Sequence, residues 1–487
     1  MTKNTYYDVI VIGTGASGMA AAVSAAEEGL SVLQLEAGKK AGGSSNYTVG
    51  MLGINSKVQQ KLGIKLDIAQ MLQQALDFSN YRANTNILVP YFKKSGKIID
   101  WLSDLGITFD GAGTDGAGVP VMHFIHGGGK AMINECLLPK AEELGAKIIY
   151  NTTVDGILTD DKNKICGVHA TQNDGTQLEF YAKNVIIASG GFVNNRKMMK
   201  KYATSYDLDR LLILNSNTTN GKAMQAAWDI GAQQYGTGLL NLAGGAIIDH
   251  GEPAYKYITS HLFVGFFGQP FLWVNEFGHR FVNEEVVFRE SEAGNALFSQ
   301  AKAFSILSKN NIDYLAKNGC LKMVLYTPEG TKLVKLQSEI DTALKNNKSF
   351  IHKGNSIAEL AKSMHVPESQ LEKTISTYNK ACQAHKDENY FKNPKYLQPV
   401  TEGPYYAVEM GVTTSNTFGG IKVTSDNVVI NNDNQLISNL YAVGNDAGGL
   451  HGDTYNHLIG GEALGYAVFS GYNAGKHIAK ANKIQKH

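Results

Sequence analysis

The chain has 487 residues, of which 43% are hydrophobic and 18% charged; this is typical of a globular protein with room for roughly two or three domains. Forty-five Lys and Arg residues stand against 44 Asp and Glu residues, and the net charge of +1 gives no electrostatic basis for nucleic acid or an anionic membrane as a partner. No apolar run approaches the length that spans a bilayer, and the N-terminus lacks the pattern of a signal peptide, so we expect a cytoplasmic protein without a membrane span.

The four cysteines are widely scattered along the chain, at Cys136, Cys166, Cys320 and Cys382. They form no CxxC pair, no haem-attachment motif and no zinc or iron–sulfur spacing, so we expect no metal. Any electron carrier must then be a bound organic cofactor or a separate partner.

The first elements form a βαβ unit. Residues 7–12 (YDVIVI) predict a buried parallel strand, and a Gly-rich turn, an Ala-rich helix and a second strand follow. Gly13, Gly15 and Gly18 have the GxGxxG spacing, in which the glycines permit a tight turn, close approach to a pyrophosphate and close helix packing. Glu36 ends the second strand, where a carboxylate can accept hydrogen bonds from a ribose diol. The unit indicates binding of an adenine dinucleotide, and the alternative is a purely structural Gly-rich turn.

Two further Gly-rich strand ends lie at residues 184–192 and 437–452, far from the first. This arrangement predicts one nucleotide-binding domain that is interrupted by an insertion at roughly residues 241–400. Within the insertion, residues 356–381 predict two helices around Pro367, the second starting near Glu368. After the βαβ unit, residues 38–53 continue into a Gly/Ser segment instead of another crossover helix, which favours FAD over NAD.

Several segments together resemble one flavoprotein family. They are VIGTGASG, EAGKKAGGSS, IIASGGF, NGKAMQAAWDIGA, GHRFVNEEVVFRE, SIAELAKSMHVPESQLEKTISTYN, TFGGIKV, NLYAVGN and GGLHG with GGEAL. The chain resembles, over nearly its whole length, the family of fumarate reductase, succinate dehydrogenase and their soluble relatives, including urocanate reductase and 3-ketosteroid Δ1-dehydrogenase. The resemblance implies an α/β fold in which a Rossmann-like FAD-binding domain (1–240 and 401–487) is interrupted by an α+β capping domain (241–400).

The resemblance also implies which residues hold FAD. They are Gly13, Gly15, Ala16, Ser17 and Gly18 at the pyrophosphate; Glu36 at the ribose; Gly42, Gly43, Ser44 and Ser45 along the phosphates and ribityl chain; Val154, Ala188, Ser189 and Gly190 near the adenine; Asn445 at the ribityl chain; Ala463 and Leu464 at the flavin pyrimidine; and Ala37, Gly50, Met51 and Asn220 as further contacts. Some relatives bind flavin covalently through a His in the Gly/Ser loop. This chain has no His before His123, so we expect non-covalent FAD.

Arg289 aligns with the arginine that fumarate reductases use as the active-site acid, just after the RF-x-NE segment. The implied chemistry is hydride transfer from flavin N5 to one alkene carbon and proton transfer from Arg289 to the other. An arginine is a weak acid, with a pKa above ~12, and needs a relay to restore its proton. The alternative is an ordinary solvated surface cation.

The residues that hold and protonate a C4 dicarboxylate in the family are mostly replaced. Val264 and Phe267 stand at the positions of the relay Glu and Arg, and Asn416 stands at that of a substrate-binding His. The second carboxylate-binding Arg is absent from residues 452–464, a segment three residues longer than in the family. A bidentate Arg cannot be mimicked by Asn or Leu, so fumarate is not the expected substrate.

The leading hypothesis is an FAD-dependent reductase of an activated C=C bond, in an enoate or enone or beside an aryl group, in a small-molecule substrate. Its catalytic candidates are Arg289, Tyr455, His457 and Asn416. The alternatives are a dehydrogenase that introduces a C=C bond next to a carbonyl, with Tyr455 as the base, and a flavin electron-transfer subunit. No second nucleotide-binding pattern is present for NAD(P)H, so the electron donor is expected to be a separate flavin reductase or free reduced flavin.

Overall fold

The computed structural model describes residues 6–115, 117–323 and 327–485. The chain forms two compact units. The first unit comprises Met1–Tyr206, Asn215–Asn241 and Asn416–His487, and the second comprises Asp207–Leu214 and Leu242–Ser415. The predicted division into cofactor-binding and capping domains, with boundaries after residues 240 and 400, is a statement about function and stays a prediction.

The first unit is built around a central, mainly parallel sheet. Its main path is β18 (Val428–Ile430), β19 (Leu436–Ala442), β9 (Gln177–Ile187), β1 (Tyr6–Ile12), β2 (Val32–Leu35) and β6 (Lys147–Ile149). Strand β1 lies between β2 and β9 and is parallel to both, with Ile10 opposite Leu33 and Val185. Val9, Ile10 and Val11 are fully buried, because helices or loops cover both faces of such a strand. The mixed helix and sheet fold that the sequence predicts is confirmed.

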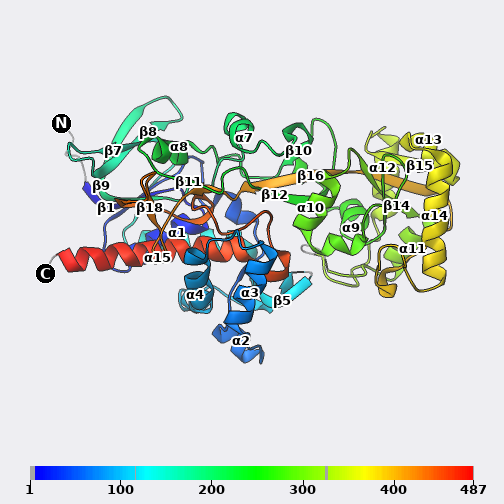
Figure 1. Cartoon of the computed structure of the whole chain (residues 1–487), viewed down its shortest axis with the longest axis horizontal. Coiled ribbons are helices and arrows are strands. Elements are labelled where there is room, and N and C mark those ends of the chain that lie inside the picture. The colour runs from blue at the N-terminus through cyan, green and yellow to red at the C-terminus, as the bar shows by residue number, and fades with distance from the viewer. Residues whose placement is uncertain (1–5, 116, 324–326, 486–487) are drawn as a thin grey trace. The chain divides into compact units, whose positions relative to one another are not determined.

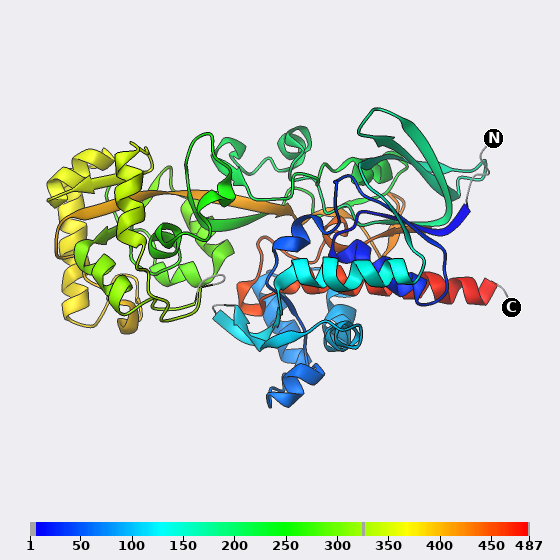
Figure 2. The ribbon, with the colours of Figure 1, turned by 180° about the vertical axis from the view of Figure 1, so that it is seen from behind.

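Helices α1 (Ala16–Ala26) and α15 (Glu462–Gln485) pack against each other, and Figures 1 and 2 both show them side by side. Every residue of α1 is buried, and most are alanine, glycine or serine. A Cβ atom added at Gly471 would lie 2.0 Å from the Ser17 carbonyl oxygen, and one at Gly475 would lie 2.1 Å from Ser24 Oγ. Small residues on both helices therefore permit this close approach.

The remaining elements of the first unit surround this core. The helices are α2 (Lys57–Lys61), α3 (Ile68–Phe78), α4 (Thr85–Asp104), α5 (Gly128–Ala131), α6 (Leu138–Glu143), α7 (Arg196–Tyr202) and α8 (Lys222–Asp229). The strands are β3 (Gly50–Leu52), β4 (Phe109–Asp115) and β5 (Ala117–Ile125) in a three-stranded sheet, β7 (Thr152–Thr159) and β8 (Ile165–Gln172) beside β9, and the pair β11 (Gln234–Tyr235) and β17 (Gly420–Ile421).

The second unit has its own sheet and its own core. The strands are β10 (Leu211–Ile213), β12 (Leu240–Ile247), β13 (Leu272–Asn275), β14 (Ala303–Ser308), β15 (Ile351–Gly354) and β16 (Tyr405–Thr417). The helices are α9 (His261–Phe267), α10 (Glu290–Phe298), α11 (Lys309–Lys317), α12 (Leu336–Lys345), α13 (Ile357–Met364) and α14 (Glu368–Gln383). The predicted pair of helices around Pro367 is α13 and α14, and Pro367 is the N-cap of α14.

Neither a membrane-spanning helix nor a metal site is found in the described residues. Across residues 6–115, 117–323 and 327–485, no helix is long and apolar enough to cross a bilayer. In the same ranges, no group of three or more His, Cys, Asp or Glu side chains is placed to hold a metal ion.

A buried histidine makes the stability of the first unit depend on pH. His123 on β5 is 0% exposed; its Nε2 lies 2.6 Å from Ser56 Oγ, its Nδ1 lies 3.0 Å from the Val121 carbonyl oxygen, and burial lowers its pKa from 6.5 to about 4. The folded chain therefore keeps His123 neutral, whereas the unfolded chain binds a proton below its ordinary pKa. Stability is fully present above pH ~6.5 and is lost by about 1.4 kcal/mol per pH unit as the pH falls toward ~4.

We expect His123→Gln to flatten this acid dependence. The measurement is urea unfolding of the wild type and the variant at several pH values between 4 and 7, followed by a probe in the first unit. The exposed His126, substituted in the same way, should leave the wild-type dependence intact. Equal pH slopes for His123→Gln and the wild type would contradict the prediction.

Candidate cofactor pocket and catalytic residues

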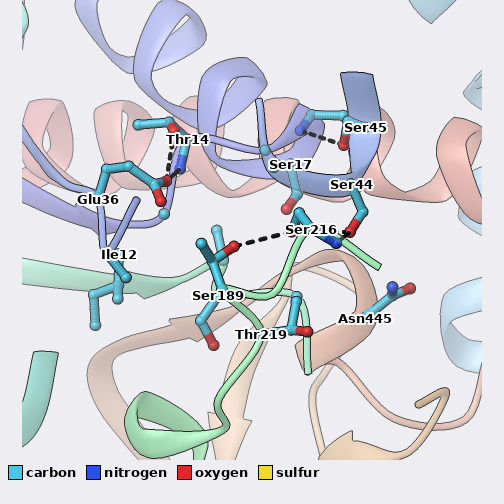
Figure 3. Close-up of a pocket in the computed structure, with 18 of the residues that line it drawn as sticks. Ile12, Thr14, Ser17, Glu36, Ser44, Ser45, Ser189, Ser216, Thr219 and Asn445 are labelled. Carbon is cyan, nitrogen blue, oxygen red and sulfur yellow. Dashed lines mark hydrogen bonds between the residues drawn. The ribbon is translucent and has the colours of Figure 1, made fainter. Parts of the chain in front are cut away.

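A pocket of about 1010 Å³, open solvent included, lies in the first unit where β1, β2 and β9 end. The carboxyl ends of parallel strands are the usual ligand site of such a sheet. The pocket is lined by Ile12, Gly13, Thr14, Gly15, Ala16, Ser17, Leu35, Glu36, Ala37, Gly43, Ser44, Ser45, Thr48, Thr152, Thr153, Val154, Ala188, Ser189, Gly190, Ser216, Thr218, Thr219, Asn220, Ala223, Asn416, Asn445, Ala463, Leu464 and Ala467. Figure 3 shows Glu36 on one side of the pocket and Asn445 on the other, which suits an elongated ligand.

Most residues that the sequence predicts for the cofactor meet in this pocket. Those that line it are Gly13, Gly15, Ala16, Ser17, Glu36, Ala37, Gly43, Ser44, Ser45, Val154, Ala188, Ser189, Gly190, Asn220, Asn445, Ala463 and Leu464, and the catalytic candidate Asn416 lines it too. Gly18, Gly42, Gly50 and Met51 lie outside the lining.

Sequence reasoning missed a set of small polar lining residues. They are chiefly Thr14, Thr48, Thr152, Thr153, Ser216, Thr218 and Thr219. The run NSNTTN at residues 215–220 was a usable signal, because six small polar residues in succession favour a loop whose side chains can bind a polar ligand.

The three glycines of the GxGxxG turn, Gly13, Gly15 and Gly18, lie in different structural surroundings. Gly13 has a φ of +105°, and an added Cβ would lie 2.4 Å from the Ala188 carbonyl oxygen. A Cβ at Gly18 would lie 2.1 Å from the Gly13 carbonyl oxygen. Gly15, the N-cap of α1, has an ordinary φ of −67°, and its added Cβ would come no closer than 3.5 Å to Ser45 Oγ. A Cβ at Gly15 would therefore make only ordinary van der Waals contacts, and Gly15 lines the pocket.

The start of α1 is suited to an anion. Gly15 has no side chain to cap the helix, and the first turn has no acidic residue. The free N–H groups and the helix dipole favour negative charge at this end. Together with the position of Gly15 in the pocket lining, this arrangement fits the pyrophosphate of a dinucleotide.

Glu36 is held in a fixed orientation at the edge of the pocket. Its Oε2 accepts hydrogen bonds from the Thr14 backbone N–H (2.9 Å) and hydroxyl (2.5 Å), and its Oε1 accepts one from the Gly38 N–H (2.6 Å). A carboxylate has about four lone-pair positions, so Glu36 can still accept about one hydrogen bond, from a hydroxyl group of a ribose.

The Gly/Ser loop places hydroxyl groups along one wall (Figure 3). Ser45 Oγ accepts a hydrogen bond from the Ala16 N–H at 3.0 Å, which ties the loop to the start of α1. Ser44 Oγ donates to Ser216 Oγ at 3.2 Å, and Ser216 Oγ lies 3.0 Å from Thr218 Oγ1. The loop is therefore joined to residues that follow it by more than 170 positions.

A buried carboxylate supports the loop after β9. Asp446 is 0% exposed and accepts hydrogen bonds from Ser189 Oγ (2.9 Å), the Gly190 N–H (2.8 Å) and the Gly191 N–H (3.2 Å). Burial raises its pKa, although the three donors act in the opposite direction. Asp446 fixes the backbone of Ser189 and Gly190, two lining residues, without lining the pocket itself.

An aromatic cluster lies near the start of α15 and contains two of the predicted catalytic residues. It consists of Phe418, His451, Tyr455 and His457, all at most 8% exposed. Ring centroids are separated by 4.3 Å for Phe418 and His451, 5.1 Å for His451 and Tyr455, and 4.8 Å for Tyr455 and His457. Tyr455 and His457 do not line the cofactor pocket, but the cluster follows Asn416 and precedes Ala463 in the chain, and both of those residues do.

Arg289 belongs to the second unit. It follows the 3₁₀ turn Glu284–Phe288 and is the N-cap of α10. Its side chain is 40% exposed, and Nη1 lies 3.6 Å from Glu292 Oε1. Val264 and Phe267, at the family's relay positions, are apolar and buried in α9. Neither can pass a proton to Arg289.

The turn before Arg289 is anchored by a buried charge cluster of Arg280, Glu284, Asp387 and Lys392. Arg280 donates from Nε and Nη2 to the two Glu284 oxygens at 2.7 and 2.8 Å, and its Nη1 lies 2.8 Å from Asp387 Oδ2. Lys392 Nζ lies 3.1 Å from Glu284 Oε2. The four side chains are between 0 and 7% exposed, and burial lowers the pKa of Lys392.

Comparison with known proteins extends these observations. Residues 8–460 match the family model described as "FAD binding domain". The vinyl phenol reductase of Lactiplantibacillus plantarum is 42% identical over 483 residues, which cover 99% of this chain and 98% of the relative. The NADH:fumarate oxidoreductase of Klebsiella pneumoniae is 28% identical over 97% of this chain, which spans 48% of that protein. The crystal structure of 3-ketosteroid delta1-dehydrogenase from Sterolibacterium denitrificans has a similar fold, with a TM-score of 0.80 at 20% identity over 98% of this chain and 100% of that one.

Proposed function

Because the chain belongs to the FAD binding domain family, we propose that it is an FAD-dependent reductase of a carbon–carbon double bond conjugated to an aromatic ring. The predicted resemblance to the fumarate reductase flavoproteins is confirmed, and the chain is an oxidoreductase of that family. The observation that carries the proposal is the 42% identity, over nearly the whole of both chains, to a vinyl phenol reductase.

The pocket of the first unit is the proposed FAD site. Gly15, which has no side chain, and the uncapped start of α1 would accept the pyrophosphate, and Glu36 would accept a hydrogen bond from the ribose. Ala463 and Leu464, in the first turn of α15, would present N–H groups to the flavin pyrimidine. The chain has no His before His123, so we propose that FAD is bound without a covalent link.

When reduced, the cofactor would supply a hydride to one alkene carbon. The protein must then supply a proton to the other carbon, and we assign this role to Arg289. Glu292, 3.6 Å from Nη1, helps to hold the guanidinium in place, and the 40% exposure of the Arg289 side chain leaves its N–H groups accessible. Asn416, Tyr455 and His457 are proposed to contact the substrate.

The residues of the site that differ from the fumarate reductase pattern favour an aromatic substrate over a dicarboxylate. Asn416 lines the pocket where fumarate reductases have a His, and it cannot bind a carboxylate as a cation would. The segment that would carry the second Arg instead contributes Tyr455 and His457 to an aromatic cluster. Offset and edge-to-face contacts among rings favour a flat aromatic ligand.

The electron donor is proposed to be a separate flavin reductase or free reduced flavin. This chain spans 48% of the Klebsiella pneumoniae relative that is named for its use of NADH. We therefore expect NADH alone to reduce the purified flavoprotein slowly, and NADH with a flavin reductase to reduce it quickly.

The proposal is tested by anaerobic reoxidation. FAD-loaded protein is reduced with dithionite and mixed separately with 4-vinylphenol, styrene, fumarate, urocanate and a steroid enone, and the return of the oxidised flavin spectrum is followed. We expect rapid reoxidation by 4-vinylphenol and no comparable rate with fumarate. Faster reoxidation by fumarate, or none with any aryl alkene, would refute the proposed substrate class.

A further inference from the structure

One ring nitrogen in the aromatic cluster is buried without a partner. His451 Nδ1 lies 3.3 Å from Glu462 Oε2, and the two side chains are 2% and 3% exposed. The other nitrogen, Nε2, is buried and finds no hydrogen-bond partner among the residues that the structure describes. Leaving such a group unsatisfied costs about 1–3 kcal/mol, so a buried ring nitrogen of this kind normally meets a water molecule, a ligand or a reacting group.

The surroundings of this nitrogen suit a flat aromatic ligand with a polar group. The Phe418 ring lies 4.3 Å from the His451 ring, and the Phe418 and Tyr455 rings are stacked at 23° with centroids 5.9 Å apart. Asn456, the residue after Tyr455 in the chain, has a buried Nδ2 without a partner within the described part of the chain. Unused polar atoms set among apolar rings are the usual composition of a small-molecule site.

We propose that His451, oriented by Glu462, is the general base that takes the phenolic proton of a substrate whose aromatic ring carries a hydroxyl group para to the vinyl group. The inference rests on the proposed function and narrows its substrate class. A histidine held by a carboxylate through one nitrogen, with the other nitrogen unoccupied, is the arrangement by which enzymes position a general base.

The chemistry explains why an aryl alkene reductase needs such a base. A para hydroxyl group donates electrons into the ring, so the vinyl group of a neutral phenol accepts a hydride poorly. When His451 removes the phenolic proton, the electron pair on oxygen can move through the ring, and the terminal carbon can accept a proton from Arg289. The product of this protonation is a para-quinone methide, whose benzylic carbon is electrophilic.

The reaction is complete once a hydride, which the bound cofactor would supply, has added to the benzylic carbon. The added electron pair forms the new C–H bond and restores the aromatic phenolate, which recovers its proton from His451. The net reaction adds one hydride and one proton to the double bond. His451 ends in its starting state, and Arg289, whose side chain is 40% exposed, regains its proton from solvent. Nε2 is buried, and the Tyr455 ring, which lies in an irregular segment, is centred 5.1 Å from the His451 ring, so side chains of the cluster must move aside as the substrate ring enters.

The first test compares three substrates on the reduced, FAD-loaded protein. 4-Vinylphenol should reoxidise it at least roughly 10²-fold faster than 4-methoxystyrene, which has no acidic proton, or 3-vinylphenol, whose hydroxyl group cannot form a quinone methide with the vinyl group. If all three react at similar rates, the role of His451 is refuted while the proposed function stands. If none of them reacts, the proposed function itself fails.

The second test uses variants and a spectroscopic reading. The anion of 4-nitrophenol absorbs visible light, so the ionised fraction can be read when it binds to the oxidised holoenzyme. His451→Asn and Glu462→Gln should both lower that fraction, and His451→Asn should lose the preference for 4-vinylphenol. His169→Gln is the matched control, because His169 is also paired with a carboxylate, Asp155 at 2.6 Å, but lies on β8 outside the pocket lining.

Retention of the FAD spectrum and of the melting temperature shows that each variant folds. An unchanged 4-nitrophenol spectrum in His451→Asn, together with an unchanged substrate preference, would overturn the proposal.

Discussion

Arg289→Gln is expected to slow reoxidation of the reduced flavoprotein by 4-vinylphenol by roughly 10²–10⁴-fold, the usual contribution of a positioned general acid. Glutamine is polar but shorter than arginine, and it cannot donate a proton as guanidinium does. The variant should still bind FAD and should be reduced by dithionite at the wild-type rate, because Arg289 belongs to the second unit and the lining of the proposed FAD site lies in the first. Stopped-flow absorbance of the flavin separates the two half-reactions.

Arg196→Gln provides the control for this prediction. Arg196 is an exposed arginine at the start of α7 and does not line the cofactor pocket. The reduced Arg196→Gln protein should be reoxidised by 4-vinylphenol at the wild-type rate. An Arg289→Gln protein that turns over 4-vinylphenol within a few-fold of the wild type would remove Arg289 from the mechanism.

Gly15→Val is expected to weaken FAD binding by roughly 10- to 100-fold while leaving the protein folded. The backbone of Gly15 is in a conformation open to any residue, and its added Cβ would meet no protein atom closer than 3.5 Å. The side chain would instead occupy the space proposed for the pyrophosphate, and overfilling a packed site costs about 1–3 kcal/mol. Titration of the apoprotein with FAD, followed by flavin fluorescence, gives the dissociation constant.

Comparison with Gly18→Ala distinguishes a loss of FAD binding from a loss of folding stability. Its Cβ would lie 2.1 Å from the Gly13 carbonyl oxygen, so the change should lower the melting temperature of the apoprotein itself. Gly15→Val should leave that temperature unchanged. If Gly15→Val binds FAD as tightly as the wild type, the pyrophosphate lies elsewhere.

Local sequence patterns were sufficient for the parts of the site that are continuous in the chain. The turn after β1 combines a buried strand, glycines at fixed spacing and an Ala-rich helix, and each of these is a short-range signal. Pro367 marks the boundary between α13 and α14 for the same reason, since proline has no N–H for a helix interior. The resemblance to the flavoprotein family, rather than local pattern, implied most of the other cofactor residues. Seventeen of the 21 residues predicted for the cofactor line one pocket.

These local patterns could not predict which side chains pair when they are far apart in the sequence. Asp446 meets Gly190 across 256 residues, and Arg280 meets Asp387 across 107. Periodicity and turn chemistry determine backbone conformation, but they do not determine which buried polar groups will face each other. The pairing of His451 with Glu462 is closer in sequence, yet it depends on how the irregular segment between them folds back on α15.

The buried charge cluster limits which amino-acid substitutions homologues of this protein can accept. Replacing one of Arg280, Glu284, Asp387 or Lys392 leaves an uncompensated charge in the interior, at a cost of about 3–5 kcal/mol. Homologues should therefore change these four positions together or keep all of them, so they should covary across more than 100 residues of sequence. We therefore expect homologues to keep the path of the chain into Arg289, and to differ in the aromatic cluster of the first unit where they accept a different alkene.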